Sequence, residues 1–595
     1  MQYFEEEQFD AQFTGKTILR MLAQFRPYLT WIAVFVGFVA AVSVLDSTFT
    51  FLTKQMIDLG ITNRDVPRLL RILYLFGGLI AGQTFMVFGF IYMAGILGER
   101  VQYDLRKKMF GHLQALSLSY FDRTAVGWIM ARVTSDSERI AQLITWGLID
   151  TMWALLSIGT GLVFMLIINW KLALIVLAAL PLIIFAALKF KKLVIVEYRK
   201  VRRINSRITG AYNENITGVK VVKALCRESK NLEEFQGLTG SMYRAGFRAA
   251  WLSALFLPIV QLIGAVILGV IFWVSGKQVA VGLLTVGGIQ AFISYVTFML
   301  WPIQDLARIY AELQNSIASA ERIFSLLDVS PDVTDKPKSI DPGTLRGEIR
   351  FEDVEFHYEE DNPVLRNFSL TVEPGETIAL VGPTGGGKTT IVNLVCRFYE
   401  PKSGVIRISG RDYTEYTLDS IHSRLGIVLQ DPHLFSGSIR ENIRYGRPDA
   451  TEQEVEEAAR LSRAHDFIRM LEHGYEEEVG EGGNLLSVGQ KQLVSLARAL
   501  LARPDIFVMD EATSSIDTVT EELIQRGMQA LMEGRTSFII AHRLSTIKRA
   551  DRILVIRDGG IEEMGTHRQL INARGHYYNL YTRQLLDERR HALTG

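Results

Sequence analysis

The sequence predicts a multidomain fold, in which an all-α transmembrane domain of six helices with long cytoplasmic helical extensions is followed by an α/β domain. Two observations carry this prediction. Up to about residue 325, apolar runs recur that reach the length of about 20 residues needed to cross a bilayer. Beyond that point, strand patterns alternate with helical ones, as in soluble α/β proteins. With 595 residues, the chain is too long for a single hydrophobic core.

The composition argues against several other classes of protein. The formal net charge is +0, which gives no argument for nucleic acid or for an acidic partner. The two cysteines, Cys226 and Cys396, lie far apart, so we expect neither a disulfide framework nor a zinc site nor a redox pair. The first residues, "MQYFEEEQFDAQF", are acidic and lack the apolar region of a signal peptide, so the first apolar segment should remain a membrane anchor.

Six apolar segments are candidate membrane spans. They cover residues 28–54, 69–97, 143–168, 171–190, 250–275 and 283–305. The connections 98–142 and 191–249 are long and carry most of the lysine and arginine of this half, which marks them as cytoplasmic. Both termini are then cytoplasmic as well. The segment "GKTILRMLAQFRPY" before the first span is amphipathic and is expected to lie along the membrane surface.

The two long connections are too helical for disorder and too charged for lipid. We interpret them as membrane helices that continue into the cytoplasm and turn there, at Ser119–Ile140 and at Ala211–Ala224. Each segment combines a polar turn, a glycine and a restart of the helical pattern. The turns are expected to dock onto the soluble half, and the alternative is a pair of solvated loops.

Ionisable residues inside spans are costly and usually face a cavity or a partner. Asp46 and Asp150 are therefore candidates for a substrate cavity in the membrane. The alternative is that both lie near the interface or pair with a neighbouring helix. Neutral replacements should alter cation transport or drug-stimulated ATPase activity, and no effect on either would remove them as candidates.

A proline- and aspartate-rich linker separates the two halves. The predicted domains are an N-terminal cytoplasmic segment at 1–27, a transmembrane domain at 28–325, the linker at 326–345 and a nucleotide-binding domain at 346–595. The last of these follows from the motifs below.

The stretch "ETIALVGPTGGGKTTIVNLV" reads as strand, glycine loop and helix. It fits the phosphate-loop pattern G-x-x-x-x-G-K-[ST] from Gly382 to Thr389. Its backbone amides and helix N-terminus suit phosphate, Lys388 suits the β and γ phosphates, and Thr389 suits Mg²⁺. The predicted ATP-binding residues here are Gly382, Pro383, Thr384, Gly385, Gly386, Gly387, Lys388, Thr389 and Thr390.

A second acidic element supports this site. "DIFVMDEATSSID" contains an apolar strand that ends in Asp510 and Glu511. Ligands of open α/β sheets bind at the carboxyl ends of strands, so Asp510 suits the Mg²⁺ shell and Glu511 suits polarising the attacking water. An acidic turn without function is the alternative. The sequence thus predicts an α/β P-loop ATPase domain that uses ATP and Mg²⁺.

With these motifs in place, the chain resembles a half-transporter of the ATP-binding cassette (ABC) exporter superfamily over essentially its whole length. "NLLSVGQKQ" matches the family signature, usually LSGGQ, and "VLQDPHLFSGSIRENI" matches the Q-loop region with Gln430. "IIAHRLST" matches the switch region with His542, "FHY" places Tyr358 at the adenine-stacking position, and "TSSID" matches the D-loop that ends in Asp517. "EEVGEGG" resembles the exporter segment that meets the cytoplasmic turns.

The resemblance implies a role for each matched residue. Gln430 would couple the Mg²⁺ and water site to the membrane domain, and His542 would contact the γ-phosphate. The implied catalytic set is Lys388, Gln430, Glu511 and His542, and the implied metal ligands are Thr389, Gln430 and Asp510. Phosphoryl transfer requires such positioning and charge stabilisation more than covalent chemistry.

The resemblance also implies a dimer, because the signature of one cassette closes over ATP held by the other. Ser487, Val488, Gly489 and Gln490 would contact that ATP in trans. Val488 stands where the consensus has glycine. A homodimer would carry this signature twice, whereas in a heterodimer it would close the partner's weaker site. We favour a heterodimer in which this chain is the catalytically competent half-transporter.

The expected function is ATP-driven efflux of small amphipathic compounds, such as drugs or lipids, across a lipid bilayer without nucleic acid. A homodimeric lipid flippase or a peptide exporter is the alternative within the family, and an ATP-gated channel or regulator is the alternative of another class. Short outer loops favour the bacterial inner membrane, and an organelle stays open.

Overall fold

The computed structural model describes residues 15–360, 362–510, 517–541, 543–583 and 585. Contacts within the chain divide it into two units. The first combines Met1–Gln114 with Ala125–Val329, and the second combines Ala115–Thr124 with Ser330–Gly595. The short segment Ala115–Thr124 therefore belongs with the second unit although it lies between helices of the first.

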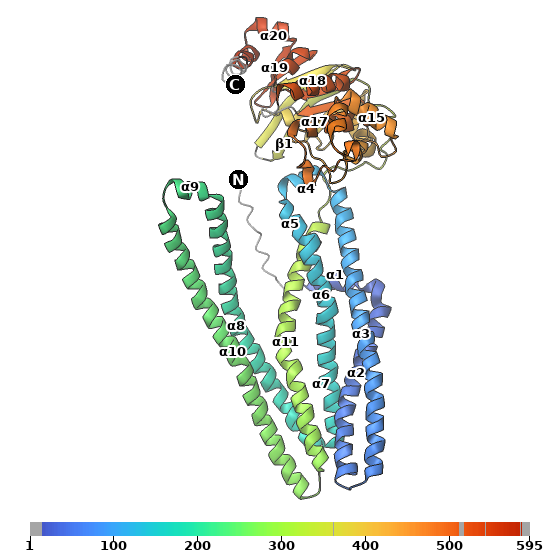
Figure 1. Ribbon diagram of the computed structural model, residues 1–595, viewed down its shortest axis with the longest axis vertical. Helices are drawn as coiled ribbons and strands as arrows, with labels where there is room; N and C mark the ends of the chain where they lie inside the picture. Colours follow the sequence, from blue (N-terminus) through green and yellow to red (C-terminus); the bar gives the residue numbers. More distant parts are fainter. Residues whose placement is uncertain (1–14, 361, 511–516, 542, 584, 586–595) are drawn as a thin grey trace. The chain divides into compact units, whose positions relative to one another are not determined.

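The first unit is helical throughout its described part (Figure 1). Its elements are α1 (Gly15–Gln24), the 3₁₀ turn η1 (Arg26–Tyr28), α2 (Leu29–Gln55), the π-helical turn η2 (Met56–Ile61), α3 (Val66–Ala115), α5 (Val126–Ala131), the π-helical turn η3 (Arg132–Asp136), α6 (Ser137–Gln142), the π-helical turn η4 (Leu143–Gly147), α7 (Leu148–Ile168), α8 (Trp170–Thr217), α9 (Val219–Ala224), α10 (Glu228–Ala280) and α11 (Val286–Leu327).

Each of the six predicted spans lies on one of these helices, apart from a few residues at the ends. Four helical stretches are long and apolar enough to cross a membrane by length and composition, namely Arg26–Ile61, Val66–Ala115, Val126–Ile168 and Glu228–Ala280. Trp170–Phe185 and Val286–Pro302 add two shorter apolar helices. The prediction of six membrane helices is thereby confirmed.

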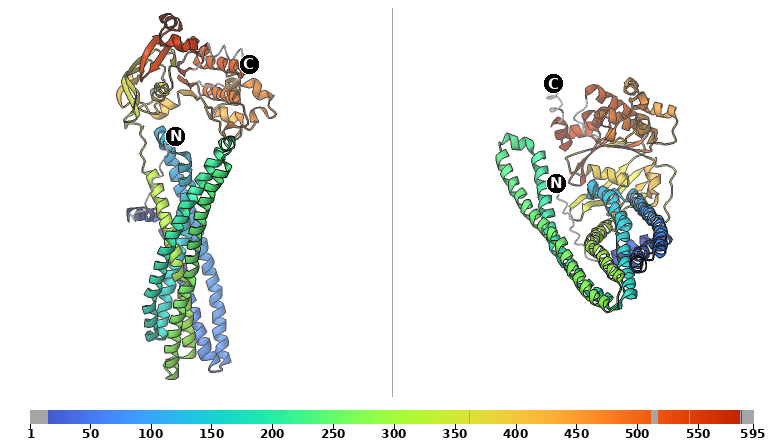
Figure 2. Two further views of the ribbon diagram at one scale, coloured as in Figure 1. Left: turned by 90° about the vertical axis from the view of Figure 1, so that its left-hand side faces the viewer. Right: turned by 60° about the horizontal axis from the view of Figure 1, so that its bottom comes forward.

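The three longest helices are far longer than a bilayer needs. α3, α8 and α10 have 50, 48 and 53 residues, which at 1.5 Å per residue is more than about 70 Å each. A hydrocarbon core of about 30 Å accounts for less than half of that length. α8 and α10 run side by side as a hairpin closed by α9, coloured green in Figure 1 and in both views of Figure 2. The predicted cytoplasmic extensions are therefore present.

The short connection between α7 and α8 has a local cause. Asn169 is extended and caps α8, because its side-chain oxygen accepts hydrogen bonds from the backbone amides of Lys171 and Leu172. Within the expected segment Ser119–Ile140, α4 ends at Arg123 and the chain is helical again from Val126. Thr124 and Ala125 are extended, so the helix breaks at these two residues.

The second unit is an α/β domain with α4 attached to it. Its elements are α4 (Leu118–Arg123), β1 (Ile349–Glu359), β2 (Asn362–Val372), β3 (Thr377–Val381), α12 (Lys388–Val395), β4 (Ser403–Ile408), β5 (Arg411–Asp412), η5 (Tyr413–Glu415), α13 (Leu418–His422), β6 (Leu425–Val428), α14 (Ile439–Arg444), α15 (Glu452–Leu461), α16 (His465–Met470), η6 (Gly474–Glu476), η7 (Glu481–Gly483), α17 (Val488–Leu501), β7 (Ile506–Asp510), α18 (Thr518–Met532), β8 (Thr536–Ile540), α19 (Leu544–Arg549), β9 (Arg552–Arg557), β10 (Gly560–Gly565) and α20 (His567–Ala573).

Two sheets organise this domain. The larger has the strand order β10-β9-β3-β8-β7-β6, and all neighbours from β9 to β6 are parallel. The smaller is antiparallel with the order β2-β1-β4-β5. One buried core joins the two sheets and α12, and a second joins the large sheet to α14–α18. The central strands β3 and β8 are buried at every residue, as parallel strands covered on both faces should be.

Candidate functional site

The register of the large sheet brings several of the predicted nucleotide-binding residues to the carboxyl ends of its strands. Leu380 of β3 pairs with Ile540 of β8, which pairs with Asp510 of β7, so the three strands end in one row. Gly382 follows this row on β3. Val428 of β6 pairs with Met509 of β7, and Gln430 follows two residues later as an exposed side chain. The phosphate loop, Gln430 and Asp510 thus follow neighbouring strand ends, where open α/β sheets bind ligands.

Two further predicted residues can be assigned to these strand ends only from their positions in the sequence. Glu511 directly follows Asp510, and His542 lies two residues beyond the end of β8. Both positions, together with most of the D-loop, lie outside the described residues. Asp517, which is described, begins α18 and accepts a hydrogen bond of 2.9 Å from the backbone amide of Thr520. This and other hydrogen bonds from Thr520 lower the pKa of the Asp517 carboxyl.

Glycines shape the phosphate loop between β3 and α12. Gly382 has φ of +142°, and a Cβ there would lie 2.2 Å from the carbonyl oxygen of Ile556. Gly387 has φ of +106° and immediately precedes the first turn of α12. Side chains at these two positions would collide or strain the backbone, so the loop takes this path only with glycine.

Lys388 is folded over the phosphate loop. Its ammonium group donates hydrogen bonds of 2.8 Å to the carbonyl oxygen of Gly382 and of 2.9 Å to that of Pro383. Burial lowers the pKa of this lysine, and the charge of Asp510 acts against that shift. Around it, Gly386, Gly387 and Thr390 are buried, while Pro383, Thr384, Gly385 and Thr389 are exposed. The loop therefore presents a cation and an exposed hydroxyl at the strand edge.

Tyr358, at the end of β1, lies beside the start of α12. Its phenol oxygen is 3.2 Å from the hydroxyl of Thr390 and accepts a hydrogen bond of 3.3 Å from the side chain of Asn393. The ring meets Phe356 and Tyr399 edge to face, with centroids 4.9 and 5.1 Å apart. The predicted adenine-stacking ring is therefore held against the helix that follows the phosphate loop.

Helix α4 reaches the same aromatic group. Arg123 donates a hydrogen bond of 2.7 Å to the backbone oxygen of Tyr358, and the phenol of Tyr399 donates to the carboxylate of Asp122. Ser119 anchors the other end of α4 through a hydrogen bond of 2.5 Å to Asp332. The sequence predicted that this turn would dock, but it did not single out Asp122, Arg123 or Tyr399. The charged pair in "SYFDR" was the available signal.

The signature stretch begins α17. The Ser487 hydroxyl accepts a hydrogen bond of 3.2 Å from the amide of Gln490, whose side chain in turn accepts one of 2.9 Å from the Ser487 amide. This reciprocal capping box fixes the first turn of the helix. Val488 is 45% exposed, and Gly489 is buried. Ser487 is therefore the N-cap of α17, and the side chain of Val488 lies at the surface.

The two membrane carboxylates differ in their surroundings. Asp46 of α2 accepts hydrogen bonds of 2.7 Å from the side chain of Gln83 on α3 and of 3.4 Å from the indole of Trp153 on α7. Asp150 lies in the first turn of α7, one turn before Trp153. The sequence did not single out Trp153. Its contact with Asp46 depends on how α2 and α7 are rotated about their axes, which the sequence pattern does not fix.

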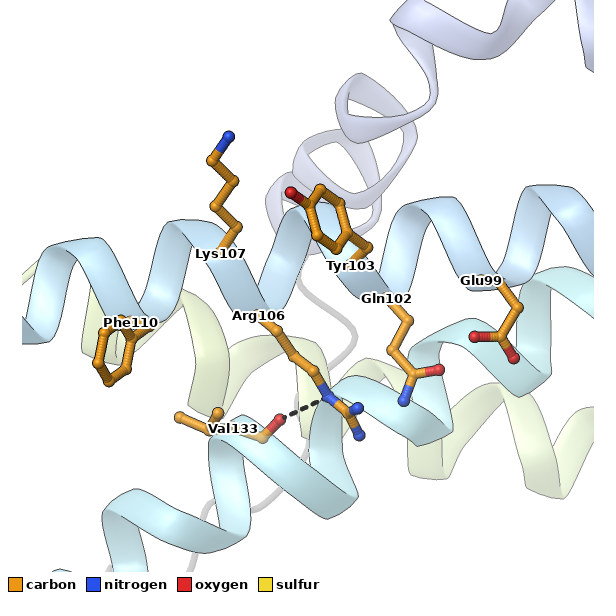
Figure 3. Close-up of a pocket in the computed structure, with 7 residues that line it drawn as sticks. All are labelled: Glu99, Gln102, Tyr103, Arg106, Lys107, Phe110 and Val133. Carbon is orange, nitrogen blue, oxygen red and sulfur yellow. Dashed lines mark hydrogen bonds between the residues drawn. The ribbon is translucent and has the colours of Figure 1, made fainter. Parts of the chain in front are cut away.

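A mixed-charge groove of about 470 Å³ lies farther along α3 (Figure 3). Its lining residues are Glu99, Gln102, Tyr103, Arg106, Lys107, Phe110 and Val133. Arg106 crosses the groove and donates hydrogen bonds of 3.2 Å to the Val133 carbonyl and to the Ser137 hydroxyl. The same stretch of α3 also contacts the residue before α2, because the phenol of Tyr28 donates a hydrogen bond of 2.5 Å to the carboxylate of Asp104.

Comparison with known proteins matches both units. The family model described as ABC transporter transmembrane region matches residues 31–303, and the one described as ABC transporter matches residues 365–514. The uncharacterized ABC transporter ATP-binding protein YknV of Bacillus subtilis is 36% identical over 98% of this chain and 97% of its own length.

Two relatives have more specific names. The fatty acid ABC transporter ATP-binding/permease protein of Mycobacterium tuberculosis is 40% identical over 90% of this chain and 84% of its own length. The ATP-dependent lipid A-core flippase of Syntrophus aciditrophicus is 34% identical over 96% of this chain and 95% of its own length. A solved structure of a bacterial Atm1-family ABC exporter with ATP bound matches with a TM-score of 0.76 at 28% identity, over 94% of this chain and 98% of that one.

The chain therefore belongs to the ABC transporter family. More particularly, it is an ABC exporter with its membrane domain and its ATP-binding domain fused in one chain. It is a multi-pass membrane protein that binds ATP and couples ATP hydrolysis to transport.

Proposed function

We propose that this exporter moves amphipathic compounds, such as drugs or lipids, out of the cytoplasm or the inner leaflet by alternating access. It works as a dimer with ATP between the two cassettes, in a bacterial inner membrane. The relatives named for fatty acids and for lipid A-core support an amphipathic substrate. The transmembrane domain spans residues 28–325 and the nucleotide-binding domain residues 346–595, joined by the linker at 326–345.

The roles of the ATP-binding and catalytic residues are part of this proposal. Gln430 and Glu511 orient and polarise the attacking water, while Lys388 and His542 stabilise charge on the phosphates. Tyr358 stacks on adenine, and Ser487, Val488, Gly489 and Gln490 contact ATP on the partner cassette. The shared edge of β3, β8, β7 and β6 supports the grouping.

The donor set at this edge fits Mg²⁺. Thr389 offers an exposed hydroxyl, Gln430 an exposed amide oxygen and Asp510 a carboxylate, and oxygen ligands are those that Mg²⁺ prefers. When bound, the ion would neutralise charge on the β and γ phosphates. The residues of the chain position the nucleotide and the water around it.

The observation that carries the proposal is the attachment of α4. In the chain this helix lies between α3 and α5, yet its residues Asp122 and Arg123 bond to Tyr399 and Tyr358 of the nucleotide-binding domain. A change at the nucleotide is therefore passed to the two helices that flank α4. Such a contact is what coupling of hydrolysis to helix movement requires.

Removing both α4 contacts should uncouple transport from hydrolysis. In the double variant Asp122→Ala and Arg123→Ala, we expect ATP-driven transport in vesicles to fall about tenfold or more, since each bond involves a charged group. ATPase activity should change less. Ser119→Ala is the comparison variant, because it keeps both tyrosine contacts and removes only the bond to Asp332, so transport should fall less than in the double variant. Equal losses of transport and of ATPase activity in the double variant would contradict this coupling role.

We further propose that the partner is a different half-transporter. In that assembly the signature of this chain closes over the weaker site of the partner, so Val488→Gly should change ATPase turnover less than about twofold, as exposed substitutions usually do. The measurement is steady-state ATPase activity of the complex purified from native membranes, with mass analysis of both subunits. A several-fold gain from Val488→Gly, or a complex containing this chain alone, would favour the homodimer.

Export itself is tested with inside-out vesicles that contain the purified complex. Addition of ATP should drive accumulation of a labelled amphiphile against its gradient, and vanadate should block it. Movement of solute that only equilibrates across the membrane would instead favour a channel.

A further inference from the structure

Asp46 lies near the middle of the membrane. Twelve residues separate it from Asp58, which pairs with Lys54 at 2.9 Å near the outer loop, and fifteen separate it from Trp31, which Arg100 covers at 4.8 Å. At 1.5 Å per residue these separations are about 18 and about 22 Å. Together they match the thickness of a bilayer with its headgroups, about 40–45 Å. The two charged markers therefore bracket Asp46 at mid-depth.

Buried hydroxyls fix the rotation of α2 around this carboxylate. Ser47 donates a hydrogen bond of 2.9 Å to Thr160 on α7, and Thr160 donates one of 3.2 Å to the Ser43 carbonyl. Tyr295 of α11 donates one of 2.7 Å to the carbonyl of Ser47. Ser43 and Ser47 are fully or almost fully buried, so the face of α2 next to Asp46 is locked between two helices. Asp46 itself is half-buried.

Among the described residues, Asp46 has no charged partner. Within the part of the chain that the structure describes, its polar partners are Gln83 and Trp153, and both are uncharged. A carboxylate at this depth is expensive unless a cation or a proton accompanies it. The described residues contain no group of three or more histidine, cysteine or acidic side chains that would hold a metal ion. A hydrated inorganic cation would therefore find few ligands here.

Aromatic rings surround the indole that bonds to Asp46. Trp153 meets Trp301 and Phe298 of α11 edge to face, with centroids 5.2 and 5.7 Å apart. Trp301 is 56% exposed, so much of its ring is available for contact. The faces of tryptophan rings attract organic cations, whose weak hydration makes them easier to bring into an apolar site than a metal ion.

We propose that Asp46, Trp153 and Trp301 form a recognition site for an amphipathic organic cation carried by this exporter. The carboxylate balances the charge of the cation, and the indole rings contact its apolar groups. This proposal rests on the proposed export function and names a substrate class for it. The class differs from the fatty acid and the lipid A-core that appear in the names of two relatives.

The test uses tetraphenylphosphonium, whose charge does not depend on pH, and laurate as an anionic amphiphile. Binding to the purified complex is followed by equilibrium dialysis, and ATP-driven uptake is followed in inside-out vesicles. Asp46→Asn keeps the shape of the side chain and removes its charge. We expect the Kd for tetraphenylphosphonium to rise about tenfold or more, while laurate binding stays unchanged or improves.

Three further variants keep the test decisive. Asp65→Asn removes a charge in the outer loop, where the carboxylate pairs with Arg68, and should leave tetraphenylphosphonium affinity unchanged. Trp301→Ala serves if Asp46→Asn does not fold, and it should weaken tetraphenylphosphonium binding severalfold. Its matched control is Trp273→Ala, an indole 67% exposed near the outer end of α10, which should have no effect.

The outcomes separate this inference from the export function. If the wild-type complex pumps laurate but neither binds nor pumps tetraphenylphosphonium, the site assignment is wrong and the export function stands. If the wild type binds tetraphenylphosphonium and both Asp46→Asn and Trp301→Ala bind it equally well, the assignment is also wrong. If no amphiphile is pumped although tetraphenylphosphonium binding depends on Asp46, the export function fails and the binding site stands.

Discussion

Replacing Lys388 by alanine is expected to raise the Kd for ATP about 100-fold, because it removes the one cation that the phosphate loop presents among its described residues. The ammonium group is largely buried and is held by two loop carbonyls at 2.8 and 2.9 Å. Charge-assisted hydrogen bonds to phosphate are about twice as strong as neutral ones, and their loss in a buried site costs about 1.5–3 kcal/mol or more. Isothermal titration with ATP measures the effect.

The control for this variant is Lys402→Ala, which removes an exposed lysine of the same domain. It should leave the Kd for ATP within about twofold, as surface substitutions usually do. Thermal unfolding of both variants shows whether the loop still folds once the carbonyls of Gly382 and Pro383 lose their partner. Unchanged ATP affinity in Lys388→Ala would refute the phosphate-loop role.

Glu511→Gln is expected to keep ATP binding and to slow hydrolysis about 10²–10⁴-fold, the range that a positioned general base contributes. Glutamine has the shape of glutamate but cannot take a proton from the attacking water. The neighbouring Asp510 ends β7 in register with Ile540, so the variant leaves the strand edge intact. Single-turnover hydrolysis and ATP binding are measured on the same preparation.

A glutamate of the same domain provides the control. Glu533 is exposed at the end of α18, and Glu533→Gln should hydrolyse ATP at the wild-type rate. If Glu511→Gln also retains normal turnover, the water-polarising role belongs to another residue. A loss of ATP binding instead of turnover would show that Glu511 contributes to nucleotide affinity and not to hydrolysis.

The architecture was predictable because its signals are local in the sequence. Apolar runs of membrane length and the strand–loop–helix pattern at Gly382–Thr389 need no knowledge of distant contacts. The capping side chains of Asn169 and Ser487 likewise act within three residues, and both begin helices where the pattern indicated. Element type therefore followed from the sequence along most of the chain.

The contacts that give the sites their chemistry were not predictable in this way. Asp46 and Gln83 lie 37 residues apart, and which faces of α2 and α3 meet depends on helix rotation. The bond between Arg123 and the backbone of Tyr358 joins positions 235 residues apart. Such pairs depend on tertiary packing, which the hydrophobic periodicity of a sequence does not predict.

The capping box at Ser487 has a consequence for the direction of a proton. A serine hydroxyl can accept and donate at once, and here a lone pair of Ser487 is taken by the amide of Gln490. The hydroxyl hydrogen is left to point elsewhere, and the amide at the start of the helix fixes the oxygen that carries it. The helix cap thus holds the serine oxygen in place, so the proposed contact with a phosphate of the partner's ATP requires only a rotation of the hydroxyl hydrogen.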